Sequence, residues 1–138
     1  MFLIGFPLLV LPFTIYNMIV FLTPGVNWTD KIASFRMMSG QEWVLTAGET
    51  LVAFAILLLI IEILKSTRLG YRTIVDHILS MILFIAMLVE FLMVKQAATS
   101  TFFLLLIVSL VDVMGGFIVT IRTAQRDINI ERIGEVQS

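Results

Sequence analysis

The sequence has no cysteine and only one histidine among its 138 residues. Without cysteine the chain can form neither a disulfide nor a thiolate metal site. A single histidine, His77, cannot supply the paired ligands of a membrane cytochrome, a two-histidine metal site or a catalytic triad beside a buried acid. We therefore expect no metal, no cofactor and no enzymatic activity.

Charged residues are also scarce, at 14% of the chain with a net charge of −1. No dense block of Lys and Arg is present, and binding to a phosphate backbone requires one, so nucleic acid is excluded as a partner. What the chain has instead is 59% hydrophobic residues and a mean hydropathy of +1.05. These values predict an integral membrane protein whose first partner is the lipid bilayer.

Four apolar segments follow one another along the chain, at residues 2–22, 43–64, 74–94 and 101–121. Each is close to the roughly 20 residues that a spanning helix needs. The spans and their connections use nearly all of residues 1–138, followed only by a tail at 122–138. The sequence thus predicts one all-α, polytopic membrane domain with four transmembrane helices in a bundle.

The first segment has an alternative interpretation as a cleaved signal peptide. It lacks a basic region before the apolar run, contains Pro7 and Pro12, and shows no small-residue cleavage pattern near residue 22. These features favour a span.

The loop after the first segment has apolar residues at helical spacing, at Trp28, Ile32, Phe35 and Met38. This spacing predicts a short interfacial helix over residues 28–38. Ser39 and Glu42 then have the spacing of a capping box, which predicts that the second spanning helix begins directly after them.

The distribution of basic residues predicts the orientation in the membrane. The loop after the second segment and the tail 122–138 hold six Lys and Arg residues, whereas the opposite side holds three. By the positive-inside rule both termini are expected in the cytoplasm, with the spans in a bacterial inner membrane.

Asp112 is the only charged residue between Thr99 and Ile121. A helix of that length places it near the bilayer midplane, where an ionised carboxylate costs several kcal/mol. Asp112 therefore needs a proton, a bound cation, water or a polar partner.

Polar residues in each span recur at helical spacing, so they should face one another inside the bundle. The outer half then has a polar pocket that could hold a proton or a monovalent cation, with the candidates Asp112, Glu49, Glu90, Asn17, Ser109 and Thr46. A second set lies at the inner mouth, at Glu62, Asp76 and His77.

Gly115 and Gly116 follow Asp112 by one turn and would let a neighbouring helix approach closely. Their first role is helix packing. A homodimer seam along Asp112, Gly116 and Thr120 is an alternative use of the same residues.

Two functional classes are compatible with this pattern. The first is an accessory or assembly subunit, or a homo-oligomeric membrane module, whose polar stripes bind other helices. The alternative is a proton- or cation-coupled transport or conduction unit that uses the intramembrane carboxylates.

Overall fold

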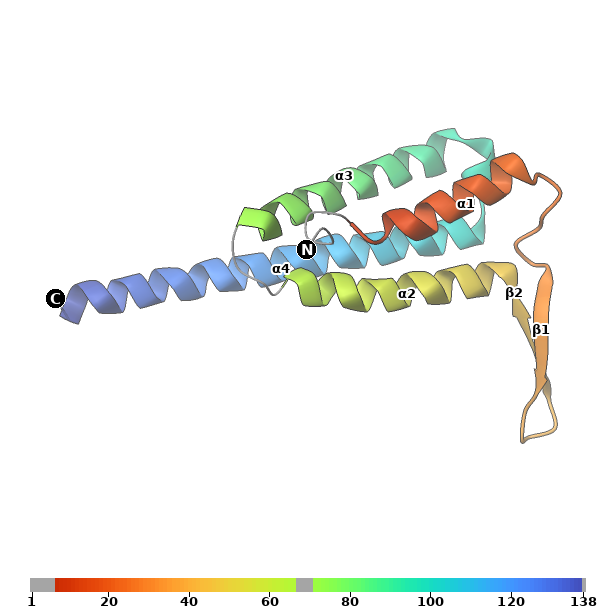
Figure 1. Cartoon of the computed structure of the whole chain (residues 1–138), viewed down its shortest axis with the longest axis horizontal. Coiled ribbons are helices and arrows are strands. Elements are labelled where there is room, and N and C mark those ends of the chain that lie inside the picture. The colour runs from red at the N-terminus through yellow and green to blue at the C-terminus, as the bar shows by residue number, and fades with distance from the viewer. Residues whose placement is uncertain (1–6, 67–70, 138) are drawn as a thin grey trace.

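The computed structural model describes residues 7–66 and 71–137. The chain is mostly helical (Figure 1). Its elements are α1 (Val10–Leu22), β1 (Lys31–Arg36), β2 (Glu42–Thr46), α2 (Ala47–Ser66), α3 (Tyr71–Met93), the 3-10 helix η1 (Lys95–Ala97) and α4 (Ser100–Gln137).

Three helices are long and apolar enough to cross a membrane, and they hold the apolar stretches Ala47–Leu64, Ile74–Met93 and Ser100–Ile118. They correspond to the second, third and fourth predicted spans. The first predicted span, 2–22, overlaps α1, which has 13 residues and is shorter than the roughly 20 that a span requires. Residues 2–6 of that prediction lie outside the described residues.

Helix α4 lies between α2 and α3 and packs against both (Figure 1). Gly48 at the start of α2 lies against Thr101 at the start of α4, and Ile63 near the end of α2 lies beside Gly115. The two helices therefore run in the same direction.

Helix α3 runs antiparallel to α4. The Phe91 ring, near the end of α3, stacks at 6.1 Å on Phe102, near the start of α4. His77, near the start of α3, lies 5.9 Å from the ring of Phe117 further along α4. These two contacts, with those of Gly48 and Ile63, show which residues of α2 and α3 lie beside which residues of α4. They therefore give the position of each polar residue along the axis of α4.

An aromatic cluster joins α1 to the rest of the helices. The Tyr16 ring stacks on Trp28 at 4.7 Å and meets Phe102 edge-on at 4.9 Å. The Tyr16 hydroxyl donates to the Gln96 carbonyl at 2.8 Å and lies 2.7 Å from Thr99 Oγ1. Burial of the ring and pairing of the hydroxyl together dock α1 onto the connection between α3 and α4.

The first loop forms an antiparallel β-hairpin, so the predicted interfacial helix over residues 28–38 is wrong. Strands β1 and β2 pair with Phe35 opposite Trp43, and their rings stack at 5.7 Å. Gly40 closes the turn with φ of 91°, in the left-handed region that favours glycine. The cross-strand aromatic pair and this turn stabilise strands over a helix.

Helix α2 begins at Ala47, four residues later than the predicted start of the second span at Trp43. The residues between belong to β2, and Ser39 and Glu42 lie in the hairpin. The predicted capping box at these two residues is therefore also wrong.

Helix α4 is 38 residues long, or about 57 Å at 1.5 Å per residue. It begins where the fourth span is predicted and continues as one helix to Gln137. The predicted tail 122–138 is thus helical through Gln137, and it extends beyond the ends of α2 and α3 (Figure 1).

We predict that Gly48→Ala lowers the stability of the protein by about 1–3 kcal/mol, because overpacking a close contact costs this much. A Cβ on Gly48 would collide with Thr101 Oγ1 and lie 3.1 Å from the Trp28 carbonyl oxygen. Thermal unfolding of the detergent-solubilised protein, followed by circular dichroism, measures the change.

Gly115→Ala is the matched control for this prediction. A Cβ on Gly115 would meet Ile63 Cγ1 at 3.7 Å, an ordinary contact. The stability of the Gly115→Ala variant should be unchanged or slightly raised, since alanine has a higher helix propensity than glycine. Equal destabilisation by both substitutions would contradict the contact at Gly48.

Candidate functional site

Asp112 and Ser109 lie on the face of α4 that is turned toward the other helices. Asp112 is 6% exposed and Ser109 is 1% exposed. The Ser109 hydroxyl has no hydrogen-bond partner among the described residues. The structure therefore places both deep candidates inside the protein, away from the lipid-facing surface.

Glu62 on α2 and Asp76 on α3 are buried as well, at 3% and 7% exposure. Glu62 precedes Ile63, which lies beside Gly115, and Asp76 precedes His77, which lies beside Phe117. Measured along the axis of α4 at 1.5 Å per residue, both acids therefore lie within about 9 Å of Asp112. We call Glu62, Asp76 and Asp112 the inner acid group.

One hydrogen bond of the inner acid group also involves the segment before α1. The Leu8 backbone N–H donates to the Glu62 carboxylate, across 54 residues of sequence. Leu8 and Leu9 are themselves buried. A carboxylate that accepts a backbone N–H thus anchors the chain that leads into α1.

His77, the third inner-mouth candidate, is half-buried on α3. Its ring tilts by 32° against Phe117. Its Nε2 atom is buried and makes no hydrogen bond to any described residue. His77 follows Asp76 directly, so both belong to the same turn of α3.

Asn17 and Glu90 form a separate pair nearer the hairpin. Their side chains lie side by side, α1 supplying the amide and α3 the carboxyl. The Asn17 amide also donates to the Phe13 carbonyl at 3.1 Å. Because Phe91 packs on Phe102, Glu90 lies about 14 Å from the level of Asp112 along α4. The structure joins two of the outer-pocket candidates but does not bring Asp112 to them.

Glu49 and Thr46 cap the first turn of α2. Thr46 N–H donates to Glu49 Oε2 at 3.1 Å, and Glu49 N–H donates to Thr46 Oγ1 at 3.3 Å. This reciprocal pair is a capping box, seven residues after the predicted one. The Glu49 side chain is exposed, and it lines a pocket of about 340 Å³ between α2 and α4 together with Trp28, Thr46 and Thr101.

Gly115 and Gly116 pack within the chain. Gly115 contacts Ile63 of α2, and Gly116 is buried. Asp112 and Gly116, two residues of the predicted homodimer seam, are thus buried within the chain, and the side chain of the third, Thr120, lies outside the described residues.

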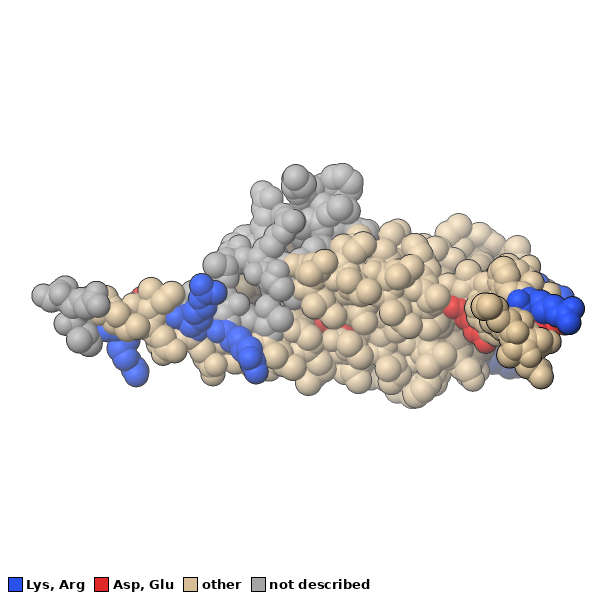
Figure 2. Space-filling view, turned by 90° about the horizontal axis from the view of Figure 1, so that it is seen from below, with Lys and Arg blue, Asp and Glu red and all other residues tan. Residues whose placement is uncertain are grey.

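On the face shown in Figure 2, Lys and Arg lie around the hairpin and along the far part of α4. Between them the surface of the described residues is mostly tan, with small red patches of Asp and Glu. A surface of this kind fits a bilayer around the three long apolar helices. Among the described residues no group of three His, Asp or Glu could hold a metal ion.

The sequence predicts Asp112 in the outer pocket, whereas in the structure it lies nearer to Glu62 and Asp76 than to Glu90 along α4. The contacts of Gly48 and Ile63 with α4 determine where Glu62 lies along it. No known family model matches the chain, and neither a curated protein nor a solved structure is significantly similar to it.

We predict that Thr46→Ala lowers stability by about 1 kcal/mol, because it removes the N-cap side chain of α2. Ser39→Ala, in the hairpin turn, is the control, since its hydroxyl only accepts a long 3.4 Å bond from Gln41 N–H. Thermal unfolding of both variants compares them. Equal stability of Thr46→Ala and Ser39→Ala would contradict the cap at Thr46.

Proposed function

We propose that the chain is a small multi-pass membrane module that acts by assembling with other membrane chains, either copies of itself or partner subunits. In this proposal α1, together with the residues before it, forms a fourth span beside α2, α3 and α4. Six of the nine basic residues flank the ends of the second and fourth spans, which favours cytoplasmic termini in a bacterial inner membrane.

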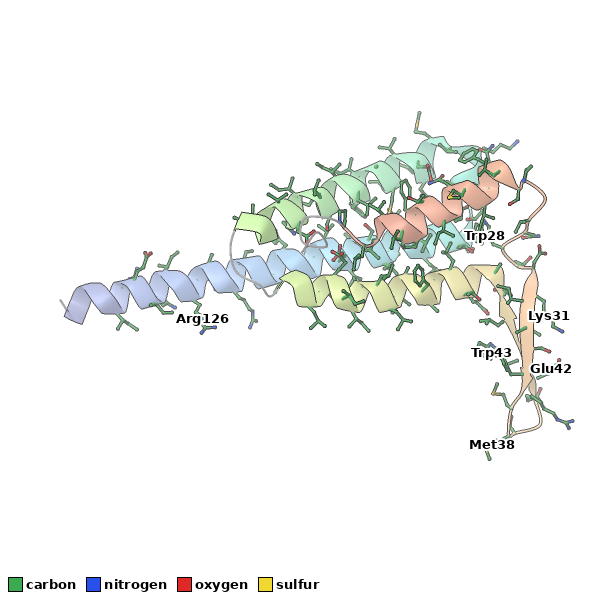
Figure 3. All side chains as sticks on the ribbon, in the orientation of Figure 1. Trp28, Lys31, Met38, Glu42, Trp43 and Arg126 are labelled. Carbon is green, nitrogen blue, oxygen red and sulfur yellow. The ribbon has the colours of Figure 1, made fainter. Side chains whose placement is uncertain are left out.

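The observation that carries the proposal is the apolar surface of the two projecting segments. At the far part of α4, Ile128, Ile130 and Ile133 are 56–58% exposed. At the hairpin, Met38 is fully exposed at the tip and Trp43 is 46% exposed, well away from the helices (Figure 3). Both segments lie beyond the three apolar stretches that could cross the membrane.

Helices outside a membrane are stabilised mainly by packing one apolar face, and a short helix alone in water is marginal. The part of α4 beyond Ile118 shows no such packing within the described chain. Burying one Ile side chain contributes about 1.5–3 kcal/mol. A partner chain that covers this segment would therefore supply the stabilisation that the protein itself does not.

Native mass spectrometry of the tagged protein, extracted with its own lipids, tests assembly. We expect a stoichiometric complex heavier than one chain of 15.6 kDa, either a homo-oligomer or a complex with a second subunit. A single chain carrying only lipid would contradict the proposal.

The inner acid group favours a second candidate function, the coupling or conduction of protons or monovalent cations. Three carboxyl groups from three helices are buried within about 9 Å of one another along α4. The hydroxyl of Ser109, one turn before Asp112, has no hydrogen-bond partner among the described residues. Intramembrane acids in transporters commonly serve as proton or ion sites. In this candidate Asp112 is the deep titrating group, and Glu62 and Asp76 with His77 lie toward the cytoplasmic mouth.

Substitution of Asp112 by Asn tests this candidate, because Asn keeps the size of the side chain and removes its titrating proton. We expect proton or cation flux into liposomes to be abolished, with the helical circular dichroism unchanged. Glu42→Gln, on the exposed hairpin, is the matched control and should retain flux. Equal flux in Asp112→Asn and in the unmodified protein would exclude the role of Asp112.

A further inference from the structure

A groove opens on the surface where α2 and α4 begin, beside the hairpin. It is the pocket of about 340 Å³ that Glu49 lines, and the two helices that form its sides run in the same direction (Figure 1). Gly48 and Thr101, whose contact brings α2 and α4 together, both line it. We call this pocket the hairpin-end groove.

The end of the hairpin-end groove that lies beside the hairpin is polar. Its side chains come from the loop before β1, the end of β2 and the first turns of α2 and α4, and they carry one carboxylate and four hydroxyls: Glu49, Thr29, Thr46, Ser100 and Thr101. Three of them, Thr29, Glu49 and Ser100, are exposed. This end therefore offers hydrogen-bond donors and acceptors to a ligand at the surface.

The other end of the hairpin-end groove is apolar. Further along the two helices its lining consists of aliphatic side chains: Val52, Ala53, Ile56 and Leu104. From Glu49 to Ile56 the groove follows α2 for about 10 Å at 1.5 Å per residue. The four aliphatic residues lie inside the apolar stretches that could cross a membrane, whereas Thr29 and Thr46 lie outside them. The groove thus changes from polar to apolar in the same direction as a phospholipid does, from headgroup to acyl chain.

The charge of the hairpin-end groove favours a headgroup that carries a primary ammonium. Glu49 is the only charged residue among the described residues that line the groove. Its Oε2 accepts the Thr46 N–H, but a carboxylate has about four lone-pair sites and can accept further bonds. An anionic headgroup would add a second negative charge beside Glu49, with no base among these lining residues to offset it. A primary ammonium has three N–H donors and forms charge-assisted hydrogen bonds with a carboxylate.

Two other occupants fit the hairpin-end groove less well. A quaternary ammonium has no N–H to donate and is recognised by open aromatic faces. The Trp28 ring, which lines the groove, is instead stacked on Tyr16 at 4.7 Å. A partner helix about 10 Å wide would fill roughly 800 Å³ over the same length of about 10 Å. That is more than twice the volume of the groove, about 340 Å³.

We propose that the hairpin-end groove binds a phospholipid with a primary-amine headgroup, phosphatidylethanolamine. The ammonium of the lipid pairs with Glu49, and its phosphate and ester oxygens accept hydrogen bonds from the hydroxyls of Thr29 and Ser100. One acyl chain lies along Ala53 and Ile56. The site lies within a single chain, so it goes beyond the proposed assembly and does not depend on it.

Glu49→Gln tests the headgroup contact, because Gln preserves the capping box of α2 and removes the charge. Glu42→Gln is the matched control, since Glu42 is an exposed carboxylate of the hairpin that does not line the groove. The purified full-length protein in mild detergent is mixed with phosphatidylethanolamine, phosphatidylcholine or phosphatidylglycerol of identical acyl chains. Native mass spectrometry then counts the lipids bound to each chain. We expect several-fold more phosphatidylethanolamine than either other lipid on the unmodified protein and on Glu42→Gln, and no such preference on Glu49→Gln.

Ala53→Phe tests the acyl-chain part of the site. A phenyl ring at this exposed position fills the apolar end of the groove, so phosphatidylethanolamine binding should fall several-fold although Glu49 is present. Ala86→Phe makes the same change at an exposed position of α3 outside the groove, and it should bind the lipid as the unmodified protein does. Circular dichroism confirms that both variants are folded.

Equal binding of the three lipids to the unmodified protein, or an unchanged preference in Glu49→Gln, would overturn the inference. Equal binding by Ala53→Phe and Ala86→Phe would overturn the placement of the acyl chain. The same spectra separate this site from the proposed assembly. A single chain that prefers phosphatidylethanolamine contradicts the assembly and supports the site, whereas an oligomer without the preference does the reverse.

Discussion

The structure depends on one constraint, that the polar side chains of a membrane-embedded helix must face other helices. Helix α4 meets it by turning Ser109 and Asp112 inward, where both are almost fully buried. The same rotation brings Gly115 against Ile63, and the exposed residues of α4 between Phe103 and Ile118 are all apolar. The positions of α2 and α3 around α4 and the inner acid group both follow from this orientation.

The close approach of α2 to α4 determines where the polar groups of α2 lie along the axis of α4. Gly48 has no side chain, so the start of α2 can lie against Thr101, and the Gly48 N–H donates to the Trp28 carbonyl at 2.9 Å. With that end fixed, the regular rise of both helices places Glu62 close to the level of Asp112. Glu90, which lies beside Asn17 at the level of the aromatic cluster, stays about 14 Å away along α4.

Hydropathy predicted the long helices well, because length and apolar content are local properties of each segment. The second, third and fourth predicted spans each overlap a helix that could cross a membrane. The hairpin could not be predicted in this way, since the spacing of Trp28, Ile32 and Phe35 also fits a helix. The contact between Phe35 and Trp43, eight residues apart in sequence, stabilises the strands over a helix.

The sequence indicates which polar residues are candidates for a site, whereas their grouping depends on the fold. Depths counted from the ends of predicted spans put Glu49 inside the outer pocket, but α2 begins at Ala47, so Glu49 caps the first turn and reaches the surface. Asn17 and Glu90, two of the six predicted pocket residues, lie side by side in the structure. The grouping of Asp112 with Glu62 and Asp76 required the register between helices, which depends on side-chain packing and not on hydropathy.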